Sequence, residues 1–337
     1  MVKRAGKQTL ILDSSPSVAG FAAVASQKEG EGPLGKEFDI VNEDAYFGEK
    51  TWEKAESRIQ KEAITTAMEK AGVVPQNLQI VFAGDLLNQC IGSAYAMRDM
   101  GVPFVGLYGA CSTMAESLSL ASLFVDSGIA ECAAAVTSSH FCSAERQFRF
   151  PLEYGGVRTP TSQWTVTGGG AAIVKAGDVA PFVKKVCFGK VTDLGVTDIN
   201  NMGAAMAPAA ADTLSQYFED TLTSADNYDM IFTGDLGYVG SKLMCELLKK
   251  EWIDLGKKHT DCGKLIYDKS QKVDAGGSGC GCSAAVLCSY IMSRIKRGEW
   301  RNVLFMATGA LMSPTSNQQG ESIPGIAHLV HLSADKN

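Results

Sequence analysis

The chain has 337 residues, 45% of them hydrophobic, so it is long enough to bury a large core. Its formal net charge is −6 and its basic residues are interspersed with acidic ones, which argues against nucleic-acid binding. No stretch reaches the ~18 consecutive apolar residues of a membrane helix, and the first apolar run is too short for a signal peptide. We therefore expect an intracellular protein that reaches a membrane only through a partner.

The ten cysteines show no sign of a metal site. No pair has the C-x-x-C spacing, and several cysteines lie in apolar stretches. We expect reduced thiols that pack as small core residues, with Cys111 as the exception.

A helix and a strand are the first clear elements. Apolar residues recur on one helical face from Trp52 to Ala71, and Gly72 and Pro75 end the pattern. A short apolar strand then ends at Gly84, where the sequence reads Gly-Asp-Leu. This alternation of helices and strands predicts sheets covered by helices.

Cys111 follows a further strand and a Gly-Ala turn, and a helix of small residues begins at about this position. A side chain at a helix N-terminus lies near unpaired N–H groups and the positive end of the helix dipole. We therefore expect the Cys111 thiol to have a lowered pKa and to be reactive. The amides of Cys111, Ser112 and Thr113 would also suit a carboxylate. The alternative is a buried core cysteine.

Residues 140–165 form a long aromatic and basic excursion between two predicted strands, and such long segments are often functional. Arg146 and Arg149 flank Phe148, and an arginine fork can bind a carboxylate at two points. His140 can donate to an anion. Structural ion pairs and an ordinary strand-end histidine are the alternatives.

The second half of the chain repeats the plan of the first. Gly-Asp-Leu of residues 84–86 returns at residues 234–236, so that Asp85 and Asp235 are 235 − 85 = 150 positions apart. The pattern around Gly128 returns around Gly298, an offset of 298 − 128 = 170. We predict two related halves, with an insertion of 170 − 150 = 20 residues near residues 256–271. The halves are expected to span residues 1–180 and 181–337.

Three motifs resemble the thiolase and ketoacyl-synthase superfamily. They are Gly-Ala-Cys-Ser-Thr at residues 109–113, the strand at residues 166–174 and the helix start at residues 202–214. Their order and the repeat match over nearly the whole chain. The resemblance implies an α/β protein of the thiolase-like fold, with two βαβαβαββ halves in a five-layer αβαβα arrangement. It also implies a homodimer formed through the first half.

The departures from that superfamily bear on activity. Its catalysis uses His with Asn, or two His, from the second half. This chain has Asp235 at one of those places and a Gly-, Ser- and Cys-rich run, residues 275–285, at the other. An ionised Asp would repel an oxyanion rather than stabilise it. We therefore expect a pseudoenzyme in which Cys111 is a vestigial nucleophile, while turn formation is the plain alternative for Asp85 and Asp235.

Longer phrases resemble the stage V sporulation protein AD family of spore-forming bacteria, from about Gly6 to Leu332. They include SSHFCSAERQFRFPLEYGG, TGDLGYVGS and ATGALMSPT. The resemblance implies a protein that binds dipicolinate, largely as its calcium chelate, for uptake into the developing spore and release in germination. It also implies membrane-embedded partners encoded in the same stage V sporulation A operon. The expected place is peripheral, at the forespore and spore inner membrane.

Dipicolinate is a flat pyridine ring with two carboxylates, so its site needs an apolar slot and fixed donors. No resident cofactor or metal is expected, and Asp235 would orient an arginine or touch chelated calcium. The ligand-binding residues that we predict are Cys111, Ser112, Thr113, His140, Arg146, Arg149 and Asp235.

Two other functions remain open. A cysteine-dependent acyltransferase or thioesterase would be acylated on Cys111 by an acyl-coenzyme A. A scaffold without a ligand would have its pocket filled by side chains.

Overall fold

The computed structural model describes residues 2–148 and 158–336. The first half contains, in chain order, β3 (Ser17–Ser26), α2 (Trp52–Ala71), β5 (Ile80–Gly84), α3 (Ile91–Met100), β6 (Phe104–Gly106), α4 (Thr113–Asp126), β7 (Cys132–Ser139) and β9 (Gly168–Lys175). The second contains β10 (Phe182–Phe188), α6 (Met202–Thr221), β11 (Met230–Thr233), α7 (Gly237–Lys250), β12 (His259–Asp261), α9 (Cys280–Val286), α10 (Met292–Lys296), β14 (Asn302–Ala310) and β15 (Gly325–Ser333). Both halves thus follow the predicted βαβαβαββ plan.

The strands of the two halves are ordered alike. The first sheet runs β6-β5-β7-β9-β3 and the second runs β12-β11-β14-β15-β10. In each sheet the second strand of this order, β5 or β11, pairs in parallel with both neighbours, and the last two strands are antiparallel to their partners. β3 and β10 meet at Ser17 and Phe182, which joins the two sheets edge to edge.

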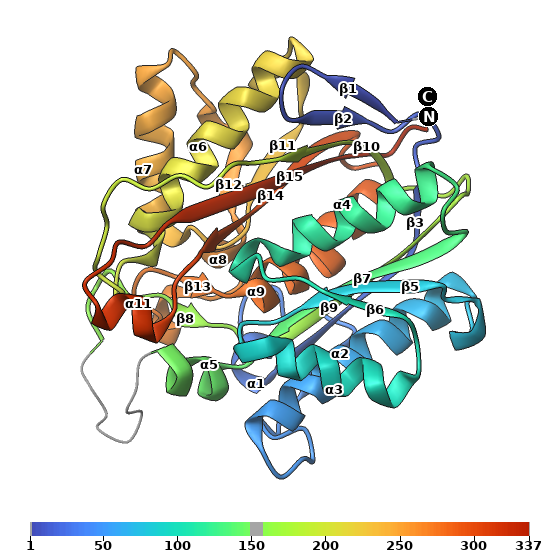
Figure 1. Ribbon diagram of the computed structural model, residues 1–337, viewed down its shortest axis with the longest axis horizontal. Coiled ribbons are helices and arrows are strands. Elements are labelled where there is room, and N and C mark those ends of the chain that lie inside the picture. The colour runs from blue at the N-terminus through green and yellow to red at the C-terminus, as the bar shows by residue number, and fades with distance from the viewer. Residues whose placement is uncertain (1, 149–157, 337) are drawn as a thin grey trace.

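Helices form three layers around these sheets (Figure 1). α4 and α9 lie between the sheets, and α4 contacts strands of both. α2 and α3 cover the outer face of the first sheet, and α6 and α7 cover that of the second. The predicted five-layer arrangement is therefore confirmed.

Local sequence explains where the elements begin and end. Thr51 caps α2 by accepting a hydrogen bond from the amide of Lys54, and Gly72 ends the helix in a left-handed conformation. The predicted bounds of this helix are thus confirmed.

The position predicted for the insertion was partly wrong. β12 pairs with β11 as β6 pairs with β5, so it belongs to the repeated plan. The additional residues follow β12, where a short helix, α8 (Cys262–Leu265), and a short strand, β13 (Gly277–Ser278), precede α9. A three-residue strand with polar residues gives too little periodicity to be recognised.

Close backbone contacts hold the central layer against the first sheet. A Cβ atom added at Gly170 of β9 would lie 2.4 Å from the carbonyl oxygen of Ala284 in α9. One added at Gly281 would lie 2.3 Å from the carbonyl oxygen of Gly168. Glycine is therefore required where β9 and α9 meet. Within residues 2–148 and 158–336, no helix is long and apolar enough to span a membrane.

Candidate functional site

Cys111 lies in a sharp turn between β6 and α4. Ala110 adopts a left-handed conformation with φ of 49°, which is uncommon for a residue other than glycine. The Ser112 hydroxyl donates to the carbonyl of Gly109 at 2.6 Å, and the Thr113 hydroxyl donates to that of Ala110 at 2.6 Å. The amide of Ser112 also donates to Gly109, at 3.0 Å. Ser112 and Thr113 therefore stabilise the turn that presents Cys111.

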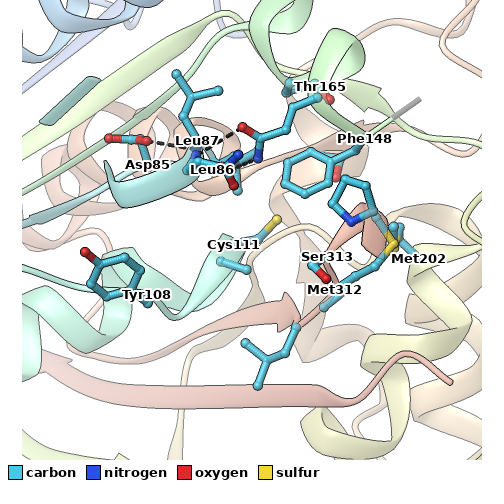
Figure 2. Close-up of a pocket in the computed structure, with 18 of the residues that line it drawn as sticks. Asp85, Leu86, Leu87, Tyr108, Cys111, Phe148, Thr165, Met202, Met312 and Ser313 are labelled. Carbon is cyan, nitrogen blue, oxygen red and sulfur yellow. Dashed lines mark hydrogen bonds between the residues drawn. The ribbon is translucent and has the colours of Figure 1, made fainter. Parts of the chain in front are cut away.

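A cavity of about 420 Å³ opens beside Cys111. Figure 2 shows the sulfur pointing into the space between Leu86 and Leu87 on one side and Phe148 and Met202 on the other. Both halves of the chain form its walls. The lining residues are Asp85, Leu86, Leu87, Asn88, Gln89, Tyr108, Ala110, Cys111, Ala144, Glu145, Gln147, Phe148, Thr165, Met202, Met206, Ser278, Ala310, Leu311, Met312, Ser313 and Pro314.

Asp235 lies behind Cys111, after the end of β11, and is completely buried. Its carboxylate accepts hydrogen bonds from the Gly279 amide at 2.8 Å, the Ser278 hydroxyl at 3.2 Å and the Thr308 hydroxyl at 2.9 Å. The Cys111 thiol is a further donor to it. Burial raises the pKa of Asp235 to about 6.

The predicted lowering of the Cys111 pKa was wrong. Burial, followed by the charge of Asp235, raises the pKa of this thiol well above its usual value. The start of a helix does favour a thiolate, but the loss of water and an adjacent carboxylate outweigh it here. Cys111 is 8% exposed, so it faces the cavity as a protonated thiol.

His140 and Arg146 lie outside the cavity lining. The His140 ring is buried, where it donates through Nε2 to the carbonyl of Ala45 at 2.8 Å and accepts from the Cys142 amide at 3.2 Å. Burial lowers the pKa of His140. Arg146 forms an ion pair with Glu53 and lies over the ring of Trp52. Arg149 falls outside the described residues.

Sequence reasoning missed most of the cavity wall. The wall includes α5 (Phe141–Phe148), whose Gln147 joins it to the loop after β5. The Gln147 side chain accepts from the Asn88 amide at 3.0 Å and donates to the Leu86 carbonyl at 3.0 Å. Asp85 has the expected turn role, because it accepts from the Leu87 amide at 2.9 Å. Met202 and Met206 are four residues apart and share one face of α6. This spacing was the signal in the sequence for the part of the cavity wall that α6 forms.

The lining is mainly apolar and carries acidic rather than basic groups. Glu145 pairs with Arg158 at 3.2 Å. Of the residues in 2–148 and 158–336, no lysine, arginine or histidine lines the cavity. Apolar walls with a few polar groups are typical of a small-molecule site.

Comparison with known proteins places the chain in a family. The family model for stage V sporulation protein AD matches residues 6–333. Stage V sporulation protein AD of Bacillus subtilis (strain 168) is 45% identical over 329 residues, which cover 97% of each chain.

Solved structures share the fold at low sequence identity. 3-oxoacyl-[acyl-carrier-protein] synthase III from Aquifex aeolicus VF5 is 13% identical with a TM-score of 0.57, over 94% of this chain and 99% of that one. Acetamide-bound OleA from Xanthomonas campestris is 11% identical with a TM-score of 0.60, over 99% of this chain and 100% of that one. At these identities the likeness shows the fold alone. The chain therefore belongs to the stage V sporulation protein AD family, a sporulation family, and has a thiolase-like fold.

Proposed function

We propose that the cavity beside Cys111 binds dipicolinate, as the free acid or as the calcium chelate, without transforming it. The observation that carries the proposal is the apolar cavity around a protonated thiol, in a member of this sporulation family. In the cell the protein would serve the movement of dipicolinate into the developing spore and its release in germination.

The size and chemistry of the cavity support this ligand. Small-molecule sites are typically ~300–1,000 Å³ in volume, with apolar walls and few polar groups. Phe148 and Met202 offer flat or adaptable surfaces to a pyridine ring, and Thr165, Ser278 and Ser313 offer hydroxyl groups to carboxylates. A dianion also requires positive charge, which either chelated calcium or Arg149 would supply.

An open cavity argues against the scaffold alternative, because a scaffold without a ligand would have its pocket filled by side chains.

The protonated state of the Cys111 thiol argues against an acyltransferase. A thiolate is the nucleophile in acyl transfer, and the environment of Cys111 favours the thiol. We expect the intact mass to stay unchanged after incubation with acyl-coenzyme A of several chain lengths. A mass increase on Cys111 would favour the acyltransferase instead.

We also propose a homodimer that works with membrane-embedded partners from the same operon, at the inner membrane of the forespore and spore. The family shown above and the lack of a spanning helix in the described part of the chain are compatible with a peripheral subunit.

Isothermal titration calorimetry with dipicolinate, with and without calcium, tests ligand identity. Phthalate is the control, because it keeps the ring and both carboxylates but lacks the ring nitrogen. Saturable heat with dipicolinate and none with phthalate is the expected result. Equal binding of both would show a site for aromatic diacids in general, and no binding of either would contradict the proposal.

A further inference from the structure

Cys245 of α7 and His259 of β12 form a pair that lies outside the cavity lining and has no role in the site described so far. Cys142 and Cys245 are the two partly exposed cysteines of the chain, and the other eight are buried. The Cys245 sulfur is 3.6 Å from Nδ1 of His259, within hydrogen-bonding reach of a thiol. Cys245 therefore combines access from solvent with a neighbouring base.

The contacts behind His259 determine which ring nitrogen carries the proton. The buried Asp261 carboxylate accepts three amide hydrogen bonds at 2.9 Å each, from Leu236, Gly237 and Gly263. Burial raises the pKa of Asp261 to about 7, so above this pH it accepts a fourth bond, from the Thr233 hydroxyl at 2.6 Å. Because that bond uses the hydroxyl proton, the Thr233 oxygen accepts from Nε2 of His259, 3.0 Å away.

Nδ1 of His259 is then the acceptor that faces the thiol. An imidazole with its proton on Nε2 has a lone pair on Nδ1, so Cys245 donates to it. Burial, and then the charge of Lys264, lowers the pKa of His259 to about 4, so the ring stays neutral and keeps this lone pair near neutral pH. One chain of donors and acceptors thus runs from Cys245 through His259 and Thr233 to Asp261.

Cys142 provides a comparison within the same chain, because its surroundings lack these features. Burial raises the pKa of both thiols, and at Cys142 the charge of Glu145 raises it further. The Nδ1 lone pair of His140, the adjacent residue, already accepts from the Cys142 amide at 3.2 Å. The charged groups near Cys245 are instead two bases and two acids, Lys264, Lys249, Asp254 and Glu246. Of the two accessible thiols, Cys245 is therefore the one that faces a free base and nearby cations.

We propose that Cys245 is a site of thiol–disulfide exchange, where low-molecular-weight disulfides modify the protein. As the Cys245 sulfur attacks a disulfide RSSR, its proton passes to Nδ1 of His259, because the thiolate is the attacking form. The S–S bond of the reagent breaks, and a new S–S bond joins Cys245 to one RS group. The other RS group leaves as a thiolate and takes the proton from His259. The thiol is oxidised to a mixed disulfide, the reagent is reduced to RSH, and His259 is neutral again.

Reaction with 2-hydroxyethyl disulfide tests the proposal, because this reagent is small and uncharged. The full-length wild type is incubated at pH 8, where Asp261 is ionised. Peptide mass mapping follows the mixed disulfides at Cys245 and Cys142 over time. We expect Cys245 to react at least about tenfold faster than Cys142. A smaller ratio, or a faster Cys142, would overturn the proposal.

His259→Asn separates the base from the hydrogen bond. The Asn side-chain oxygen can accept from the thiol but does not take its proton. We therefore expect exchange at Cys245 to slow at least about tenfold, while the rate at Cys142 stays within about twofold. An unchanged rate at Cys245 would show that exposure alone makes it reactive, and the role of His259 would be overturned.

Side-chain ¹⁵N NMR at pH 8 tests the proton position without any reaction. The spectrum of His259 should show a protonated Nε2 and a bare Nδ1, and the signal missing from His259→Asn identifies it among the four histidines. A proton on Nδ1 would overturn the proposal. If the rate at Cys142 also changes in His259→Asn, the fold is disturbed, and the wild-type spectrum and rate ratio decide.

Discussion

Burial and the charge of Asp235 together keep Cys111 protonated. Asp235 brings a buried carboxylate to a thiol that the turn before α4 would otherwise activate, and its other donors hold it there. The place after β11 is thus occupied by a group that helps to keep the thiol protonated. Burial and this carboxylate together explain why a cysteine at a helix start is expected to react slowly.

Asp235→Asn should make Cys111 more reactive. The amide carries no charge and can donate to a thiolate, so the pKa of Cys111 should fall and its alkylation by iodoacetamide at pH 8 should speed up about tenfold or more. Peptide mass mapping follows Cys111 separately from the other nine cysteines. Cys111→Ala identifies the modified peptide. An unchanged or slower rate would show that burial alone controls the thiol.

His331 of β15 should make the fold sensitive to acid. Burial, with Lys185 and Lys184 nearby, holds its pKa at about 3, whereas its unfolded value is about 6.5. A depressed histidine pKa means that the unfolded chain binds the proton first, so stability is lost as the pH falls below about 6.5.

His331→Phe removes this proton uptake and keeps the edge-to-face contact with Tyr228. Between pH 7 and pH 4.5, the free energy of unfolding of the variant should gain about 2 to 3 kcal/mol relative to the wild type. Urea unfolding at the two pH values measures this gain. A difference between the proteins that does not change with pH would contradict the account.

At the scale of the elements, β9 and α9 approach each other closely through glycine. Gly170→Ala would place a methyl group 2.4 Å from the Ala284 carbonyl oxygen, so one of the two elements must move. We expect a loss of about 1 to 3 kcal/mol in the free energy of unfolding. In the matched control, Gly177→Ala, the nearest atom would be 3.3 Å away and the loss should stay below about 1 kcal/mol. Equal stability of the two variants would show that the contact is not tight.

The elements also show how far the sequence could be interpreted. The bounds of α2 were predictable because one apolar face and a glycine cap define them locally. β12 was missed because its three polar residues form a strand only by pairing with β11. Cys111 and Asp235 were predicted to share a site and do lie together. The wall made by Gln147 and Phe148 of α5 and by residues 311–314 depends on segments brought together by the fold, which no local pattern records.

The whole molecule is a repeat whose two halves share one cavity. The expected dimer has a testable interface at β6. Among the described strands, β6 pairs only with β5, so its other edge is free, and its Val105 is 39% exposed. We predict that light scattering gives twice the 35.8 kDa of one chain, and that Val105→Lys shifts the protein toward the monomer. A monomeric wild type, or a variant that dimerises equally well, would exclude this edge as the interface.

The claim that dipicolinate binds in the cavity beside Cys111 is tested most directly by calorimetric titration of three proteins in parallel. They are the wild type, Ala310→Phe and Leu222→Ser. Ala310→Phe fills the cavity from the end of β14. Leu222→Ser is a control at an exposed site that is distant in sequence from the lining. We predict saturable binding to the wild type and the control, and at least a tenfold loss of affinity in Ala310→Phe. Equal affinity of all three proteins would place the ligand elsewhere, and no binding to the wild type would contradict the function proposed here.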